Sequence, residues 1–184
     1  ICSIYIDDEV EFMINGIEKI REQDEYDGYR IKLKAEYDTI ITPLAIDVTT
    51  GDVITPRELF YSYEMIFEEN TIGIWTYNIE TVLAEKVETI LQRGELNTRL
   101  RDYYDIYILT QTQNFDKLLF KEALQKTAEY RKTIQIFDDI QKRIDMIVTS
   151  AILKERWKKY TQNYSYAKEI TFEETVDAVN KLIV

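Results

Sequence analysis

A lysine within an apolar helical stripe is the first residue of this sequence whose position suggests chemistry. Residues 78–93 have apolar residues at helical spacing, and the stripe consists of Ile79, Val82, Leu83, Val87, Ile90 and Leu91. Lys86 lies inside this stripe. Because an unpaired charge on a buried face is costly, Lys86 must extend its amine to solvent, pair with a carboxylate or contact a ligand.

Two aspartates on the following predicted helix also interrupt an apolar background. The stretch NTRLRDYYDIYIL is apolar on nearly all sides, which predicts that it is largely buried. Asp102 and Asp105 share a face of this helix, and Arg101 can reach Asp105 one turn further on. Two interpretations are open. The charges form an arginine–aspartate network that joins two helices, or they form a site where a carboxylate, Lys86 and Arg93 meet a triphosphate.

Asp47 is the third candidate, near the end of a predicted apolar strand. One interpretation is a cross-strand ion pair with Arg30, which contributes little if it is exposed. The other is a metal-coordinating carboxylate, because Mg²⁺ prefers a few hard oxygen ligands together with substrate phosphates. One aspartate does not complete such a site, since a two-metal phosphoryl-transfer enzyme needs further carboxylates nearby. The nearby upstream acidic cluster is Asp7, Asp8 and Glu9.

Several classes of catalytic site are excluded by residue types that the sequence lacks. It contains no histidine, which removes Ser/His/Asp triads, Cys/His pairs and HExxH zinc sites. Cys2 is the one cysteine, so neither an internal disulfide nor a thiolate zinc site is possible. The five glycines form neither a GxxxxGK[ST] nor a GxGxxG loop. Carboxylates, lysines and arginines remain for chemistry.

The composition is that of a globular cytosolic protein. Of its 184 residues, 45% are hydrophobic and 31% are charged, and no apolar run approaches the ~20 residues that span a bilayer. We therefore expect a cytoplasmic location and no membrane association. The net charge of −11 disfavours a protein whose whole surface wraps nucleic acid, although a local basic groove remains possible.

The elements that position the candidates are predicted to be strands first and helices afterwards. Residues 29–37 alternate between apolar and charged, and residues 40–48 are largely apolar, so the two segments should form a hairpin with a two-residue loop. Its register would pair Tyr37 with Ile40, Arg30 with Asp47 and Lys32 with Ala45. A further strand is expected at 9–14, a short helix at 58–67 and a strand at 72–77.

Helices are expected over most of the second half of the chain. The first runs from an Asn78 N-cap to Arg93 and stops at Gly94, and the second is capped by Asn97 or Thr98 and runs to about Thr110. The others are predicted at about 115–130, 134–163 with a break, and 171–183. The fold class is therefore α+β, and we place the domain boundary between an N-terminal region, 1–77, and a helical domain, 78–184.

Three stretches of the sequence together resemble the AbiEii/AbiGii abortive-infection family. They are AIDVTTGDVITP at residues 45–56, YNIETVLAEKVETILQRG at 77–94 and NTRLRDYYDIYIL at 97–109. Members of this family are polymerase-β-like nucleotidyltransferases, and they are the toxins of two-gene phage-defence systems. The resemblance implies a nucleotidyltransferase-like sheet, here partial, followed by a C-terminal helical bundle.

The resemblance also implies roles for the candidate residues. Asp47 matches the third acidic residue of the family, beside the metal site, so it is expected to be catalytic and to bind the metal. Lys86 matches an essential lysine that contacts the nucleotide triphosphate, while Asp102 and Asp105 cover the final acidic motif. Arg93 and Arg101 are expected to contact phosphate by position.

One family motif has no counterpart in this chain. A Gly-Ser or Gly-Thr step, followed about ten residues later by Asp-x-Asp, should precede the first strand, and it supplies two metal ligands. Because the chain begins at Ile1 and not at methionine, we expect it to be part of a longer protein, and to be inactive alone.

The expected function is nucleotide transfer from an NTP, with Mg²⁺, to an acceptor such as RNA or tRNA. The resemblance implies a winged-helix antitoxin as the partner of such a toxin. Two alternatives remain open: a non-catalytic interaction module with an acidic surface, or a nucleotidyltransferase that acts on a small molecule such as an antibiotic.

Overall fold

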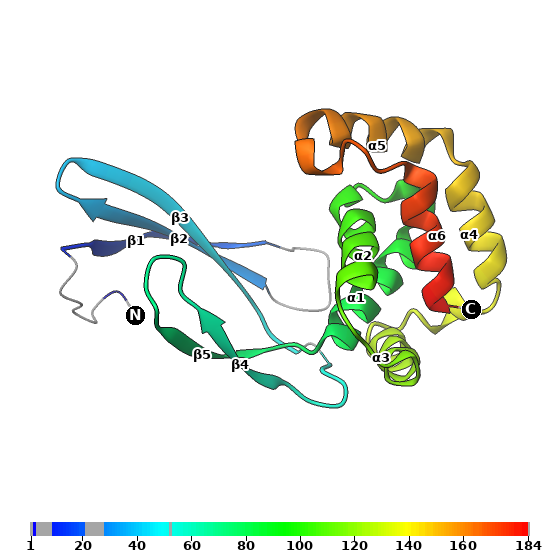
Figure 1. Ribbon diagram of the computed structural model, residues 1–184, viewed down its shortest axis with the longest axis horizontal. Helices are drawn as coiled ribbons and strands as arrows, with labels where there is room; N and C mark the ends of the chain where they lie inside the picture. Colours follow the sequence, from blue (N-terminus) through cyan, green and yellow to red (C-terminus); the bar gives the residue numbers. More distant parts are fainter. Residues whose placement is uncertain (1, 3–8, 21–27, 52, 184) are drawn as a thin grey trace. The chain divides into compact units, whose positions relative to one another are not determined.

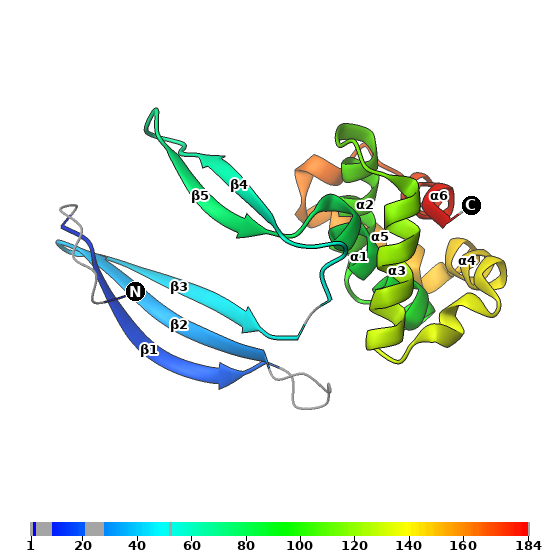
Figure 2. The same ribbon diagram turned by 90° about the horizontal axis from the view of Figure 1, so that it is seen from below.

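The computed structural model describes residues 2, 9–20, 28–51 and 53–183, which fall into two compact units (Figures 1 and 2). The units are Ile1–Asp52 and Val53–Val184, and each is described here by itself. Asp7 and Asp8 of the upstream acidic cluster lie outside the described residues.

A three-stranded antiparallel sheet forms the first unit. Its strands are β1 (Glu11–Lys19), β2 (Gly28–Tyr37) and β3 (Ile40–Thr49), in the order β1-β2-β3. The predicted hairpin is confirmed: Tyr37 pairs with Ile40, Lys32 with Ala45 and Arg30 with Asp47. Asp38 has a positive φ of 50° in the tight turn, a conformation that aspartate tolerates better than most residues. The strand predicted at 9–14 is present and extends further, to Lys19.

The first unit buries little of its apolar surface. Among its described hydrophobic residues, Leu33 is the one that is buried, while Ile14, Ile46 and their neighbours on β1 and β3 are exposed. A small sheet with one buried side chain has little core of its own. The main hydrophobic core of the described chain therefore lies in the second unit.

A two-stranded hairpin begins the second unit and corrects one prediction. Residues 58–67 were predicted to be helical, but the chain forms β4 (Leu59–Glu64), which pairs antiparallel with β5 (Thr71–Thr76). The aromatic residues of this segment favour strands, and the ring of Phe60 packs edge-on against that of Trp75 across the pair at 5.1 Å. The strand predicted at 72–77 agrees with β5.

Six helices follow the hairpin within the described residues (Figure 1). They are α1 (Ile79–Arg93), α2 (Leu100–Thr112), α3 (Lys117–Tyr130), α4 (Ile140–Thr149), α5 (Ala151–Asn163) and α6 (Phe172–Ile183). As predicted, Asn78 caps α1, its side chain accepting from the Thr81 amide at 2.8 Å, and Gly94 ends it with a φ of 49°. The predicted break within 134–163 falls at Ser150, which caps α5.

The predicted caps of α2 are wrong. Arg99 occupies the N-cap position and provides no side-chain hydrogen bond to the helix. Asn97 instead accepts a hydrogen bond from the Arg99 backbone amide at 2.8 Å, which stabilises the loop before the helix. Fewer residues of α2 are buried than expected. The buried ones are Leu100, Asp102, Tyr103 and Ile106.

The helices share one core. Helix α1 packs against α3 and α2, while α6 packs against both α2 and α4 (Figure 1). Leu83, Leu91, Ile106 and Leu153 are fully buried there. The predicted α+β class is confirmed, with antiparallel strands followed by helices. The domain boundary predicted at residues 77–78 coincides with the change from strand to helix, and as a domain boundary it stays a prediction.

Among the described residues, no helix is both long and apolar enough to cross a membrane.

Candidate functional site

Lys86 is held between two carboxylates where α1 packs against α2. Its Nζ lies 3.1 Å from Asp102 Oδ1 and 2.7 Å from Asp105 Oδ2. The side chain of Lys86 is 18% exposed, compared with 4% for Asp102 and 22% for Asp105. The lysine that interrupts the apolar stripe of α1 therefore pairs with the two aspartates that interrupt the apolar background of α2.

Two arginines complete the charge network around these aspartates. Arg99 Nε lies 2.8 Å from Asp102 Oδ2, and Arg101 Nε lies 3.7 Å from Asp105 Oδ1. The pair between Arg101 and Asp105, one turn apart, was predicted from spacing and is present. Each carboxylate thus has two cationic neighbours, which offsets the desolvation that a buried carboxylate would otherwise suffer.

This network forms one wall of an open pocket of about 810 Å³. Further lining residues come from α5 and the residue after it. Together the lining residues are Lys86, Thr98, Arg99, Leu100, Arg101, Asp102, Asp105, Arg156, Lys159, Tyr160, Asn163 and Tyr164. Five of them are cationic and two are acidic, so the pocket is positively charged in a chain whose net charge is −11. A local excess of positive charge in a concave site attracts anionic ligands.

The α5 side of the pocket was not found from the sequence. Arg156 Nη1 donates to the backbone carbonyls of Glu95 and Asn97, both at 2.9 Å, which fixes its guanidinium near the loop before α2. Burial raises the pKa of Tyr160 above the ordinary value for tyrosine. The one available signal was the basic run KERWKK in an acidic chain.

Asp47 belongs to the first unit and is engaged with Arg30. The guanidinium donates to both carboxylate oxygens, from Nε to Oδ1 at 2.7 Å and from Nη2 to Oδ2 at 2.8 Å. This bidentate contact lowers the pKa of Asp47 and raises that of Arg30. Both side chains remain nearly half exposed. The ion-pair interpretation of Asp47 is therefore confirmed, while metal binding by Asp47 stays a prediction.

Arg93 lies apart from the pocket lining. It occupies the last turn of α1, where it is exposed and where a cation is favourable for the helix dipole. Its proposed contact with phosphate stays a prediction. Within the described part of the chain, no group of three or more His, Cys, Asp or Glu side chains is placed to hold a metal ion.

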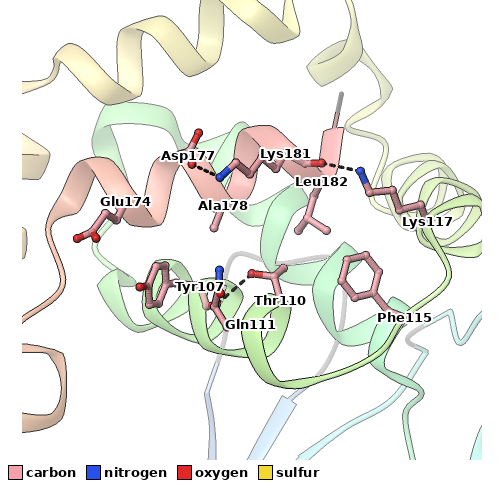
Figure 3. Close-up of a pocket in the computed structure, with 10 residues that line it drawn as sticks. All are labelled: Tyr107, Thr110, Gln111, Phe115, Lys117, Glu174, Asp177, Ala178, Lys181 and Leu182. Carbon is pink, nitrogen blue, oxygen red and sulfur yellow. Dashed lines mark hydrogen bonds and ion pairs between the residues drawn. The ribbon is translucent and has the colours of Figure 1, made fainter.

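A second pocket, of about 660 Å³, lies between α2 and α6 (Figure 3). Its charges are balanced within the pocket, since Lys181 pairs with Asp177 at 2.6 Å and Lys117 donates to the Lys181 carbonyl at 3.3 Å. Glu174 bonds to Thr171 at the start of α6, and this hydrogen bonding lowers its pKa. Its lining has two cations and two carboxylates, so this pocket attracts an anionic ligand less strongly than the pocket around Lys86 does.

A cationic pocket around a paired lysine offers charge complementarity to an anionic ligand. A family profile described as "Nucleotidyl transferase AbiEii toxin, Type IV TA system" matches residues 1–178. The chain therefore belongs to the AbiEii nucleotidyltransferase toxin family. This confirms the family resemblance, and the match extends well beyond residue 109, where the last of the three similar stretches ends.

The chain is also similar to a viral protein of unknown role. It is 28% identical over 138 residues to the uncharacterised protein L227 of Acanthamoeba polyphaga mimivirus, covering 69% of this chain and 80% of that protein. No solved structure matches the chain.

Proposed function

We propose that this protein transfers a nucleotide from an NTP to a hydroxyl of an acceptor RNA, with release of pyrophosphate, and that the triphosphate binds in the pocket around Lys86. The family is a nucleotidyltransferase family of type IV toxin–antitoxin systems, which supports the reaction type. The observation that carries the assignment to this pocket is the lysine held by Asp102 and Asp105 inside a positively charged lining.

Lys86 is the residue that we expect to contact the triphosphate. Its ammonium is partly exposed and is fixed in position by two carboxylates, so little reorganisation is needed when an anion arrives. Arg99, Arg101, Arg156 and Lys159 line the same pocket and add to the attraction. Charge that builds up on the phosphates during transfer is stabilised most by groups held in place beforehand.

The two aspartates are given different roles. Asp102 is almost fully buried and contacts both Lys86 and Arg99, so it acts as a positioning residue. Asp105 is more exposed, forms an ion pair with the same lysine, Lys86, and lines the pocket. We assign Asp105 the task of orienting the acceptor hydroxyl and accepting its proton, which a carboxylate within hydrogen-bond distance can do.

Magnesium is proposed as the ion that accompanies the NTP. Mg²⁺ is usually bound through substrate phosphates and one or two carboxylates, and Asp47 is the carboxylate that the family resemblance assigns to it. The described residues do not complete a metal site, because they contain no cluster of three suitable side chains and Asp47 is occupied by Arg30.

The biological setting is proposed in the same way. A type IV toxin–antitoxin family implies an antitoxin partner. We propose that this partner is a winged-helix protein encoded next to the toxin, that the acceptor is tRNA and that the outcome is growth arrest during phage infection.

Label transfer tests the proposed function. The protein, expressed from its complete reading frame, is incubated with Mg²⁺, total RNA and each α-³²P-labelled NTP in turn. We expect label in RNA, and a loss of roughly 10²- to 10³-fold in the Lys86→Ala variant, the range seen when one group that stabilises transition-state charge is removed. Lys126→Ala is the matched control, because Lys126 is exposed and pairs with Glu122 on α3.

The outcomes distinguish the proposal from its alternatives. RNA labelling that survives in Lys126→Ala and is lost in Lys86→Ala supports it. Absence of labelling by folded wild-type protein would overturn the RNA acceptor, and labelling of a small molecule in the same assay would identify a different substrate class. Equal labelling by Lys86→Ala and the wild type would show that Lys86 takes no part in the reaction.

A further inference from the structure

Four tyrosines gather where α5 ends, beside the pocket around Lys86. The ring centroids are 4.7 Å apart for Tyr160 and Tyr164, 5.5 Å for Tyr164 and Tyr166, and 4.7 Å for Tyr166 and Tyr104. The hydroxyls of Tyr160 and Tyr166 lie 2.9 Å apart. Trp157 stacks on Tyr160 from the core side at 5.3 Å. The rings therefore form one continuous aromatic cluster, which we call the tyrosine platform: Tyr104, Tyr160, Tyr164 and Tyr166.

Half of this platform faces solvent. Tyr164 is 46% exposed and Tyr166 is 50% exposed, whereas Tyr104 and Tyr160 are half-buried and hold the other two in place. Tyrosine is a rigid side chain, so an exposed ring that is held by neighbouring rings offers a stacking surface at low entropic cost. A flat ligand can lie on Tyr164 and Tyr166 without displacing core residues.

Cations accompany the platform along the same helix. Arg156 and Tyr160 are four residues apart and share one face of α5, and Lys159 and Tyr164, the residue after the helix, lie beside them in the pocket lining. From residue 151 to 168 the chain has five cationic residues and one acidic residue, although the whole chain has 23 cationic and 34 acidic residues. Aromatic rings interleaved with cations are the combination that binds unpaired nucleic acid, through stacked bases and neutralised phosphates.

We propose that the tyrosine platform, together with Arg156 and Lys159 of α5, binds an unpaired stretch of RNA by stacking its bases on Tyr164 and Tyr166. The inference rests on the proposed function, because it assigns the place where the acceptor strand lies next to the nucleotide pocket. It goes beyond that function by naming the residues that recognise the strand and the form of RNA that they accept.

The extent of the platform favours a strand over the NTP alone. Tyr160 and Tyr164 line the pocket, but Tyr166 and Tyr104 lie outside its lining, so the aromatic surface continues past the space that a single nucleotide would fill. A strand must be unpaired to use this surface, because the bases of a duplex are already stacked on one another. Duplex RNA should therefore bind more weakly than the same strand alone.

Fluorescence anisotropy with a labelled, unpaired RNA of about 12 nucleotides tests the proposal, a length within the range that such sites cover. The double variant Tyr164→Leu/Tyr166→Leu should bind roughly tenfold more weakly, because it loses the rings on which bases stack. Tyr164→Phe/Tyr166→Phe keeps the rings and should bind as the wild type does. Tyr61→Leu, at a tyrosine of β4 that is 54% exposed, is the control away from the platform.

Two further ligands make the result decisive. The same strand in duplex form should bind more weakly than the unpaired strand, and a polyglutamate peptide of equal charge should compete poorly. Equal binding of the wild type and the double leucine variant would overturn the platform, as would equal binding of duplex RNA or of polyglutamate. Absence of binding of the unpaired strand to the wild type would also overturn it.

Failure of this inference is distinguishable from failure of the proposed function. RNA binding that depends on the tyrosines, without transfer of label from any NTP, leaves the platform standing and removes the enzymatic proposal. If the double leucine variant transfers label to RNA and binds RNA as the wild type does, the platform is removed and the enzymatic proposal stands.

Discussion

Asp102 and Asp105 are one helical turn apart, yet solvent reaches them to different degrees. Asp102 is 4% exposed and lies between Lys86 and Arg99, while Asp105 is 22% exposed and lies between Lys86 and Arg101. A carboxylate that is buried with two cationic partners stabilises the packing of α1 on α2. A more exposed carboxylate remains accessible to a substrate. We therefore expect Asp102 to act mainly in structure and Asp105 in the proposed reaction.

Substitution of the buried aspartate tests its structural role. Asp102→Asn should lower the free energy of unfolding by about 1.5–3 kcal/mol, the range for hydrogen bonds that involve charged groups. Asp105→Asn should lower the free energy of unfolding by less than Asp102→Asn does, and it should reduce the transfer activity by more. Urea denaturation followed by circular dichroism measures the first effect, with Asp177→Asn on the exposed face of α6 as the control. A larger loss of stability in Asp105→Asn than in Asp102→Asn would contradict this division.

The ion pair of Asp47 makes a prediction about pH. Because Arg30 lowers the pKa of Asp47, the folded protein holds this carboxylate ionised to lower pH than the unfolded chain does. Its stabilising contribution is therefore complete above the ordinary aspartate pKa and is lost as the pH falls through the lower, folded value. Carbon NMR titration should give a lower pKa for Asp47 in the wild type than in Arg30→Ala. Identical pKa values in the two proteins would show that the pair does not form in solution.

The sequence predicted part of this site and missed the rest for a physical reason. Lys86, Asp102 and Asp105 break the apolar pattern of adjacent helices, and a buried charge must find a partner, so local arguments singled out the three residues without showing that they pair with one another. Arg156 and Lys159 sit on an ordinary, mostly polar helix more than fifty residues further along the chain. Their approach to the pocket depends on how α5 packs, which no local pattern encodes.

At the scale of elements, helices were easier to predict than the second hairpin. The apolar period and the Asn78 and Gly94 signals fixed α1 at the correct residues, because capping is a local property. The segment 58–67 contains four aromatic residues, and its state depends on β5, a strand that begins seven residues after β4 ends. We predicted a helix for this segment, but pairing with β5 stabilises it as a strand.

The start of α6 provides a prediction at this scale. Thr171 and Glu174 form a capping box: the Glu174 amide donates to Thr171 Oγ1 at 3.2 Å, and the Thr171 amide donates to Glu174 Oε2 at 2.8 Å. Thr171→Ala should lower the free energy of unfolding by about 1 kcal/mol, as is usual for loss of an N-cap side chain. Thr171→Ser, which keeps the hydroxyl, should cost much less. Thermal melts of the three proteins would contradict the assignment if alanine and serine behaved alike.

At the scale of the whole molecule, the charge of the chain and the charge of its main pocket have opposite signs. The net charge of −11 favours a soluble, nucleic-acid-repelling surface, while the lining around Lys86 has five cations and two carboxylates. Overall composition therefore gave no indication of the pocket. A cationic pocket in an acidic chain attracts an anionic ligand locally, and binding there should weaken as salt is added.

Equilibrium binding of NTP to the wild-type protein and to Lys86→Ala tests whether the triphosphate binds in this pocket, because it requires neither an acceptor nor turnover. Titration calorimetry with each NTP should give at least about tenfold weaker binding to Lys86→Ala, the loss expected when a charged hydrogen-bond partner of a phosphate is removed. Lys126→Ala should bind as the wild type does. Equal affinity of the wild type and Lys86→Ala for every NTP would contradict the assignment of this pocket to the triphosphate.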